Sequence, residues 1–284
     1  MAFGSDNAHS CGFLRPRVQE FVQRPVLIGR RYGRPMCFEL DSHPPVAPIA
    51  GAAVTHEHLV LESADGTRFA AFAAVPDGDP AAGILILPDV RGLYGFYEEL
   101  ALRFAELGHP ALAIDYFGRT AGADRRGDDF EFAEHVAATT PEGIRDDVAA
   151  AVAALRDRGA PSVLAVGFCF GGRQAWLAAA DGHGLAGAVG FYGNPGERNG
   201  QPGPAQRAGE ISAPVLALMA GEDHAIGPDA VEAFGAALTA AGAEHEIVTY
   251  PGAPHSFFDR KQEQFAAESA DAWERTLAFV AAHG

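Results

Sequence analysis

Short apolar runs alternate with longer amphipathic stretches from about residue 57 to the end of the chain. The stretches have the apolar spacing of helices and lie near 96–107, 141–158, 172–181, 228–242 and 263–283. The apolar runs between them are GILILP (83–88), PALAID (110–115), SVLAVGF (162–168), AGAVGFY (186–192), PVLALMA (214–220) and HEIVTY (245–250). Alternation of buried-type strands with helices predicts a mostly parallel sheet that is covered on both faces.

Two further strands precede this alternation. The runs HLVLES and TRFAAFAAV flank Asp65 and Gly66, and this dipeptide is typical of a tight hairpin turn. One helix also has clear end signals, with Thr140 as the cap, Pro141 at the first position and Gly159 just past the end. The sequence therefore predicts an α/β fold: one domain over residues 51–284, with an eight-stranded, mostly parallel sheet and helices on both faces.

Residues 1–50 differ in character from the rest of the chain. The first 35 residues contain six arginines against only Asp6 and Glu20, and they lack the apolar core of a secretory signal. The stretch 42–53 is rich in proline and alanine, as linkers are. We expect an N-terminal extension that is disordered or a linker, with a targeting peptide as the alternative.

Composition narrows the class of protein. The chain has 284 residues, of which 48% are hydrophobic and 20% charged, as in ordinary globular proteins. A net charge of −16 argues against nucleic acid and anionic membranes as partners. The cysteines at 11, 37 and 169 have no spacing typical of zinc sites or disulfides, and no apolar run approaches the ~18 residues of a membrane span. We expect a cytoplasmic monomer that acts on a small molecule and binds no metal.

Candidate chemistry follows the strands, because ligands of open α/β sheets bind beyond the carboxyl ends of the strands. The side chains at these positions are Asp89, Val90 and Arg91; Asp115, Tyr116 and Arg119; Cys169; Tyr192 and Asn194; Glu222, Asp223 and His224; and His255. Cys169, Asp223 and His255 thus occur in the order of nucleophile, acid and histidine that α/β-hydrolases use. Glu222 is the alternative acid, and His224 and His245 are the alternatives to His255.

The motif GFCFG at 167–171 has the spacing of the G-x-S-x-G nucleophile elbow, with cysteine in place of serine. A nucleophile on a tight strand-to-helix turn is strained, and its flanking glycines leave room for neighbouring backbone. The N-terminus of the following helix lowers the pKa of a thiol and stabilises an oxyanion. A buried structural thiol is the alternative interpretation of Cys169.

The segments PDVRGLYGFYEELALRFAELGHPALAIDYFGR (88–119), VGFCFGGRQAW (166–176), AGEDHAIGP (220–228) and YPGAPHSF (250–257) together resemble the dienelactone hydrolase family. The resemblance covers roughly residues 57–283 and implies an α/β-hydrolase fold with a Cys-His-Asp triad. It makes Cys169 the nucleophile, His255 the general base and later acid, and Asp223 the residue that orients His255.

The resemblance also implies roles for other residues. The backbone N–H groups of Phe170 and Val90 would form the oxyanion hole. Asp89 stands where the family has an acidic residue, usually glutamate, that helps to activate the thiol. Arg119 matches the first arginine for the substrate carboxylate, whereas the position of the second arginine is Asp259.

Other residues complete the predicted site. Arg91, Tyr192 and Ser256 are further candidates for substrate binding. Salt bridges at the rim are the alternative for Asp89, Arg91 and Arg119. The long connections 117–140 and 193–210 are expected to form pocket walls.

The predicted function is that of a cysteine-dependent hydrolase, which cleaves an ester or lactone through an acyl-enzyme on Cys169 and needs no cofactor. A non-catalytic ligand-binding or sensor protein with the hydrolase fold is one alternative. An acyltransferase that uses the same triad is another.

Overall fold

A computed structural model describes residues 42–127, 129–259 and 261–284. The predicted N-terminal extension, residues 1–50, lies outside the described residues as far as residue 41. Its remaining part and the predicted linker contact helix α1 (Gly95–Glu106). His43 Nδ1 lies 2.8 Å from Glu99 Oε2, and the Ile49 N–H donates to Glu106 Oε2 at 2.9 Å.

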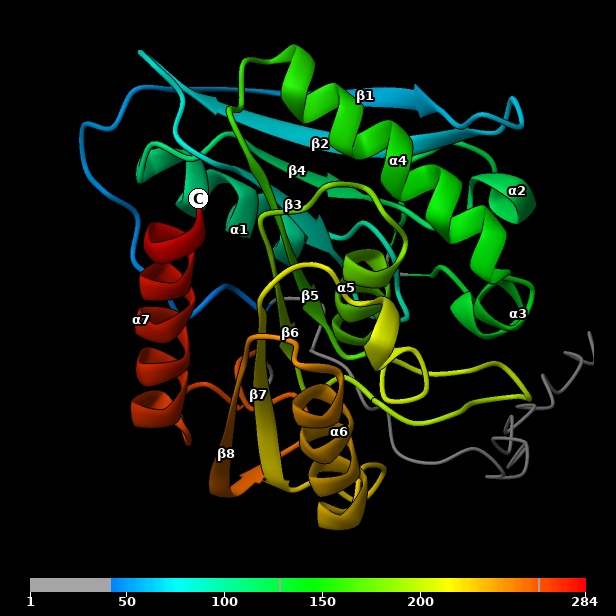
Figure 1. Cartoon of the computed structure of the whole chain (residues 1–284). Coiled ribbons are helices and arrows are strands. Elements are labelled where there is room, and N and C mark those ends of the chain that lie inside the picture. Colours follow the sequence, from blue (N-terminus) through cyan, green and yellow to red (C-terminus); the bar gives the residue numbers. More distant parts are fainter. Residues whose placement is uncertain (1–41, 128, 260) are drawn as a thin grey trace, which may run out of the picture. The chain divides into compact units, whose positions relative to one another are not determined.

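Within the described residues, eight strands form one sheet in the order β1-β2-β4-β3-β5-β6-β7-β8 (Figure 1). The strands are β1 (Val54–Glu62), β2 (Arg68–Pro76), β3 (Gly83–Leu87), β4 (Ala111–Ile114), β5 (Val163–Phe168), β6 (Gly187–Phe191), β7 (Val215–Glu222) and β8 (His245–Pro254). Strand β2 pairs antiparallel with β1 and β4, and all other pairs are parallel. The predicted eight-stranded, mostly parallel sheet is confirmed.

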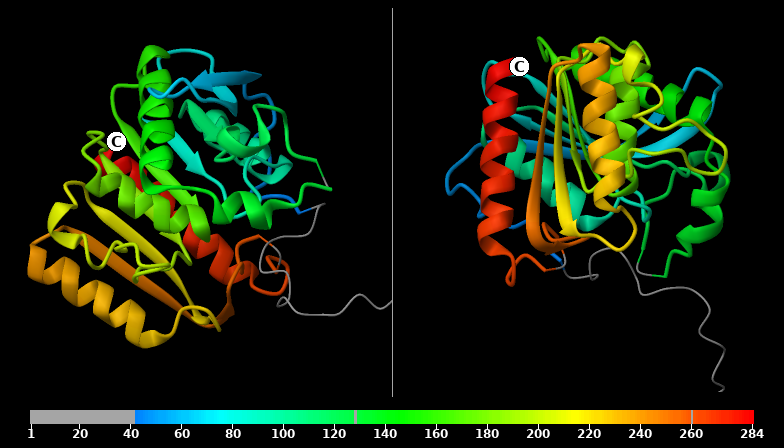
Figure 2. Two further views of the ribbon diagram at one scale, coloured as in Figure 1. Left: turned by 90° about the vertical axis from the view of Figure 1, so that its right-hand side faces the viewer. Right: turned by 60° about the horizontal axis from the view of Figure 1, so that its bottom comes forward.

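Helices cover both faces of the sheet. Apart from α1, they are α2 (Gly118–Ala121), α3 (Phe132–Ala137), α4 (Pro141–Asp157), α5 (Phe170–Ala180), α6 (Pro228–Ala241) and α7 (Ala266–His283), with a short 3-10 helix at Ala208–Glu210. Helices α1 and α7 pack on one face, and α4, α5 and α6 on the other. In the second view of Figure 2, α7 (red) and α6 (orange) lie on opposite sides of β7 and β8.

The residue pattern of β3 explains this two-layer core. Ile84 and Ile86 belong to the apolar cluster beneath α1 and α7, whereas Leu85 and Leu87 belong to the cluster beneath α4, α5 and α6. Alternate side chains of a strand point to opposite faces, so a strand covered on both faces must be apolar throughout. This is why the buried strands could be read from the sequence as continuous apolar runs.

The predicted turn and cap signals are present in the structure. Gly66 has φ +81° in the turn between β1 and β2, and the Thr67 N–H donates to Asp65 Oδ1 at 2.9 Å. The Gly143 N–H donates to Thr140 Oγ1 at 3.1 Å and so caps α4. The connections 117–140 and 193–210 contain short helices, which are α2, α3 and the 3-10 helix, and their role as pocket walls stays a prediction.

Among residues 42–127, 129–259 and 261–284, no helix has the length and apolarity that a membrane crossing requires. The same residues contain no group of three or more metal-ligating side chains. Cys11 and Cys37 lie outside the described residues.

Candidate active site

Cys169 lies on the sharp turn that joins β5 to α5. Its backbone has φ 54° and ψ −111°, a strained conformation for a residue other than glycine. The Cys169 N–H donates to the Phe191 carbonyl at 3.0 Å, which ties the turn to the end of β6. The side chain is buried but retains 9% exposure. The turn is therefore a nucleophile elbow in its backbone geometry, as the spacing of the glycines predicts.

The glycines of the motif are required by close backbone contacts. A Cβ on Gly167 would lie 2.0 Å from the Gly171 carbonyl oxygen, and a Cβ on Gly171 would lie 1.9 Å from the Leu87 carbonyl oxygen. Real Cβ atoms do not approach so closely, so only glycine fits at either position. These contacts let α5 begin at once after Cys169, with its N-terminus against the end of β3.

His255 and Asp223 meet beyond the ends of two neighbouring strands. Asp223 directly follows β7, and His255 directly follows β8. The distance from His255 Nδ1 to Asp223 Oδ2 is 2.6 Å, and the side chains are 13% and 1% exposed. The other carboxylate oxygen of Asp223 accepts the N–H of Ala225 at 2.8 Å. The carboxylate is thus held on both oxygens and fixes the orientation of the imidazole.

The protonation of His255 is set by its two partners. Burial alone would lower its pKa, but the hydrogen bond to Asp223 and the nearby Cys169 outweigh burial and raise the pKa of His255 to about 10. The protonated imidazolium is therefore favoured between a carboxylate and the thiol. A cation near a thiol favours the thiolate, which is the nucleophilic form of cysteine.

The alternatives that the sequence left open are placed elsewhere. Glu222 and His224 are exposed to solvent on either side of the buried Asp223. His245 starts β8, at the opposite end of the strand from His255, and its Nδ1 contacts the Ala243 carbonyl at 2.8 Å. The structure thus brings together the three residues that the hydrolase order singled out.

The two predicted oxyanion donors lie in adjacent loops. Leu87 at the end of β3 pairs with Gly167 of β5, so the residues after each strand are neighbours. Phe170 is the first residue of α5, where a backbone N–H has no intrahelical acceptor. Within the part of the chain that the structure describes, the Val90 N–H also has no acceptor. The oxyanion roles of Val90 and Phe170 stay predictions.

Asp89 is buried at the start of the loop that contains Val90. It is 1% exposed, and its Oδ1 accepts the Arg91 N–H at 2.8 Å. Asp89 therefore closes a turn of its own loop, next to the predicted nucleophile. Thiol activation by Asp89 and substrate binding by Arg91 stay predictions.

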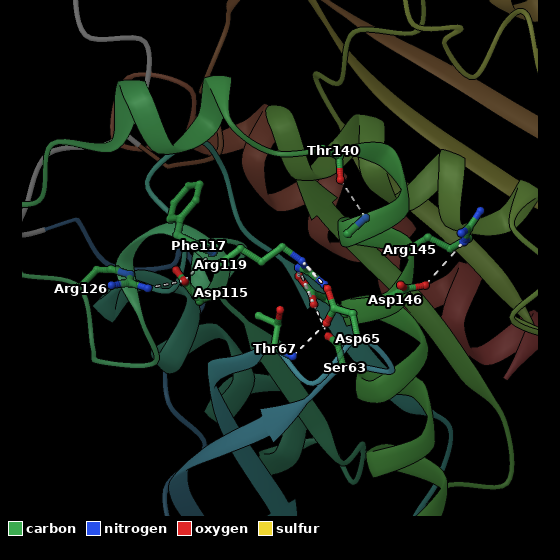
Figure 3. A network of polar contacts seen from close by, with 12 residues as sticks. Ser63, Asp65, Thr67, Asp115, Phe117, Arg119, Arg126, Thr140, Arg145 and Asp146 are labelled. Carbon is green, nitrogen blue, oxygen red and sulfur yellow. Dashed lines mark hydrogen bonds and ion pairs between the residues drawn. The ribbon is translucent and has the colours of Figure 1, made fainter.

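Arg119 is engaged by two carboxylates (Figure 3). Its Nε donates to Asp65 Oδ2 at 3.0 Å, and its Nη1 donates to both oxygens of Asp147 at 3.0 and 2.8 Å. Ser63 donates a hydrogen bond to the same Asp147 carboxylate. The ion-pair alternative is thus what the described residues show at Arg119, and binding of a substrate carboxylate stays a prediction. Neither acidic partner was predicted.

Tyr192 and Ser256 lie beside the histidine. The ring centroid of Tyr192 is 4.9 Å from that of His255, and the Tyr192 hydroxyl donates to Asp259 Oδ2 at 3.3 Å. Tyr192 and Ser256 have φ angles of 38° and 63°, so both occupy strained turns at the candidate site. Asp259, where the family has its second arginine, is buried with 2% exposure. Substrate contacts of Tyr192 and Ser256 stay predictions.

Arg173 in the first turn of α5 was not predicted. Its side chain is 6% exposed and donates to the carbonyls of Asn194 and Pro202, both at 3.1 Å, and to that of Gly196. Arg173 thereby ties the connection 193–210 to the helix that starts at the nucleophile. Its signal in the sequence was a lone arginine in the otherwise apolar start of a predicted helix.

A buried thiol on an elbow, with a His–Asp pair at the same edge of a mostly parallel sheet, defines the class of α/β-hydrolases. The family model of the "Dienelactone hydrolase family" matches residues 69–284. The chain belongs to this family, and it is a hydrolase that acts on ester or lactone bonds.

Individual relatives agree with this assignment. Two curated proteins named "Putative carboxymethylenebutenolidase" are similar to the chain. The one from Yersinia pestis is 32% identical, covering 77% of this chain and 85% of that protein. The one from Escherichia coli K12 is 29% identical, covering 83% and 95%. A crystal structure named as a "Putative Dienelactone Hydrolase" from Klebsiella pneumoniae has a TM-score of 0.72 at 29% identity, covering 81% of this chain and 99% of that one.

Proposed function

We propose that the protein hydrolyses its ester or lactone substrate through a covalent acyl-enzyme on Cys169. The observation that carries this proposal is the coupling of three side chains, Asp223, His255 and Cys169. The carboxylate holds Nδ1 of the His255 ring at 2.6 Å, and the same ring interacts electrostatically with Cys169, which lies on a strained elbow. This is the arrangement that nucleophilic catalysis requires.

The first half of the reaction forms the acyl-enzyme. The Cys169 thiolate attacks the substrate carbonyl, a sulfur–carbon bond forms, and the carbonyl oxygen becomes an oxyanion. The N–H groups of Val90 and Phe170 donate to that oxyanion. The carbon–oxygen bond of the ester then breaks, and His255 gives its proton to the leaving oxygen.

The second half releases the acid. Neutral His255 takes a proton from water, and the resulting hydroxide attacks the thioester carbonyl. The sulfur–carbon bond breaks, and Cys169 leaves as the thiolate beside the reprotonated His255. For a lactone, the same two steps open the ring without a separate alcohol product.

We infer the substrate class from the names of the relatives and from the two positions where the family has arginines. The relatives' name refers to a lactone hydrolase, and we propose a small ester or lactone as the substrate. A substrate with a carboxylate needs a cation, but Arg119 is bound by Asp65 and Asp147, and Asp259 replaces the second family arginine. A panel that pairs neutral esters with dienelactone and related anionic lactones therefore identifies the preferred class.

Replacement of the thiol tests the mechanism. Cys169→Ala is expected to lower turnover of an activated ester by at least about 10³-fold, because nucleophile and base act as a unit. The wild type should release a burst of alcohol equal to the enzyme concentration, and mass spectrometry should find the acyl group on Cys169. Tyr250→Phe is the control for a neutral substitution. Tyr250 lies on the edge strand β8, and its hydroxyl donates to Asp271 Oδ2 at 2.8 Å.

Two results would replace the proposal with one of its alternatives. Full turnover by Cys169→Ala would exclude the covalent mechanism, and binding without turnover by the wild type would favour a sensor. Product analysis with competing alcohols or thiols separates hydrolysis from acyl transfer, since a transferase passes the acyl group to the added acceptor.

A further inference from the structure

The loop after β3 is held by two buried tyrosine hydroxyls from different parts of the chain. Tyr97 of α1 accepts the Asp89 N–H at 3.0 Å, and Tyr116, after β4, donates to the Pro88 carbonyl at 3.0 Å. Both tyrosines are almost fully buried, with 0% and 2% exposure. The two hydroxyls therefore fix the backbone directly before Val90, because one accepts the Asp89 N–H and the other donates to the Pro88 carbonyl.

The rest of the loop is held just as closely. The Arg91 N–H donates to Asp89 Oδ1 at 2.8 Å, and the Gly92 N–H donates to the Asp89 carbonyl at 3.1 Å. The Leu93 N–H donates to Asp115 Oδ1 at 3.1 Å. Every N–H from 89 to 93 except that of Val90 thus has an acceptor among the described residues. Of these five N–H groups, only that of Val90 is therefore available to donate to a bound substrate.

The same tyrosines contact the residues on both sides of the nucleophile. The Tyr97 ring packs on Phe168 with centroids 5.7 Å apart, and the Tyr116 ring packs edge-on against Phe170 with centroids 5.3 Å apart. Each tyrosine therefore links the loop of Val90 to the elbow of Cys169. Burial, followed by the charges of Asp89 and Asp115, raises the pKa of Tyr116 well above its usual range, so its hydroxyl keeps the proton that it donates.

We propose that Tyr97 and Tyr116 are positioning residues that set the Val90 amide at the distance from Phe170 that a tetrahedral oxyanion requires. An oxyanion donor acts only when it lies about 2.7–3.1 Å from the oxyanion, so its backbone must be held firmly. The two hydroxyls hold it through Asp89 and Pro88, while the rings fix the elbow. This inference rests on the proposed acyl-enzyme mechanism.

Two reaction rates measured at Cys169, acylation and alkylation, distinguish a loss of oxyanion positioning from general damage to the site. Acylation by an activated ester passes through an oxyanion, whereas alkylation by iodoacetamide consumes the same thiolate without one. Tyr97→Phe and Tyr116→Phe each remove one oxygen atom and keep the ring. We expect each variant to slow the acylation burst about tenfold, less than the 10²–10³-fold loss of a whole oxyanion donor. Alkylation of Cys169 should stay within about twofold of the wild type.

Further readouts make the test decisive. In steady state we expect kcat to fall while KM changes little, because the donor acts on the transition state. Tyr250→Phe, a Tyr→Phe change away from the loop, should leave both rates unchanged. Melting temperatures measured on all three variants report whether each is folded, and Tyr97→Phe and Tyr116→Phe are independent tests of the same loop.

The possible failures are distinguishable. Wild-type acylation rates in both phenylalanine variants, or acylation and alkylation slowed by the same factor, would overturn the positioning role alone. A wild-type protein that forms no acyl-enzyme would overturn the proposed function and this inference together. Tenfold slower acylation with unchanged alkylation supports the positioning role.

Discussion

Two polar clusters are each built around a buried carboxylate, and they differ in what else binds the cationic group that this carboxylate holds. The cluster that we propose to be catalytic, called the catalytic cluster from here on, consists of Cys169, Asp223 and His255. The clamp cluster consists of Ser63, Asp65, Arg119 and Asp147, and Figure 3 shows Arg119 with Asp65. In each, a carboxylate binds a cationic group at short distance: 2.6 Å for His255 and 2.8 Å for Arg119.

The two clusters differ in the second partner of the cationic side chain, Arg119 in one and His255 in the other. In the clamp cluster, two carboxylates bind one guanidinium, and the partners come from the β1–β2 turn, α2 and α4. Arg119 therefore joins three segments of the chain. In the catalytic cluster, Asp223 holds Nδ1 of His255, and the same ring interacts electrostatically with the Cys169 thiol. An arginine whose charge is bound by two carboxylates stabilises the fold. A histidine that is bound by one carboxylate and also lies near a thiol can transfer a proton.

The largest expected effect comes from Asp223→Asn. The asparagine can keep the Ala225 N–H as a donor to its oxygen, but it no longer stabilises the imidazolium or selects its tautomer. We expect kcat for an activated ester to fall about 10³- to 10⁴-fold. The free energy of unfolding in urea should change far less than activity. Activity within tenfold of the wild type would show that Asp223 is not the orienting acid, and Glu222→Gln is the matched control.

The clamp cluster should respond in the opposite way. Asp147→Ala removes a fully buried carboxylate and leaves Arg119, which is 25% exposed, with Asp65 alone. We expect the free energy of unfolding to fall by about 3 kcal/mol, the lower end for a broken buried pair, because Arg119 is partly solvated. Turnover of a neutral ester by the folded variant should stay within a few-fold.

Asp65→Ala is the matched control within the same cluster. Asp65 is 43% exposed, so in a urea titration its removal should lower the free energy of unfolding much less than the removal of Asp147 does. Equal losses from the two variants would contradict the view that Asp147 carries the clamp. A large rise in KM for anionic substrates alone, after either change, would instead assign Arg119 to substrate binding.

The catalytic cluster was more readable from the sequence than the clamp cluster for a physical reason. The strands are apolar on both faces, and the elbow needs glycine at 167 and 171, so both leave local signals. Each of the three residues proposed to be catalytic then follows a strand end, and the strand ends of a parallel sheet bring such side chains together. Arg119 instead pairs with Asp65 and Asp147, which lie in a turn and in a helix interior and carry no local signal for the contact.

The same reasoning explains the other omissions. Tyr97 looks like any apolar position of an amphipathic helix, and its hydroxyl contact with Asp89 depends on how α1 packs over β3. The short helices α2 and α3 lie in a connection with no sustained apolar period. Tertiary contacts, not local pattern, decide such features.

The smallest expected effect is the pH dependence that the catalytic cluster gives to stability. The pKa of His255 is raised to about 10, from about 6.5 in an unfolded chain. A raised pKa means that the folded state binds the proton more tightly, so the stabilisation is complete below pH 6.5 and is lost as pH rises toward 10. The difference in unfolding free energy between wild type and His255→Gln, measured in urea at several pH values, should therefore shrink across this window.

In a Cys169→Ala background the pH window should narrow, because one of the two partners that raise the pKa of His255 is gone. NMR titration of the His255 ring in that background should show a lower pKa. A difference that stays constant from pH 6 to pH 10 would show that the His255 proton is not held by this cluster.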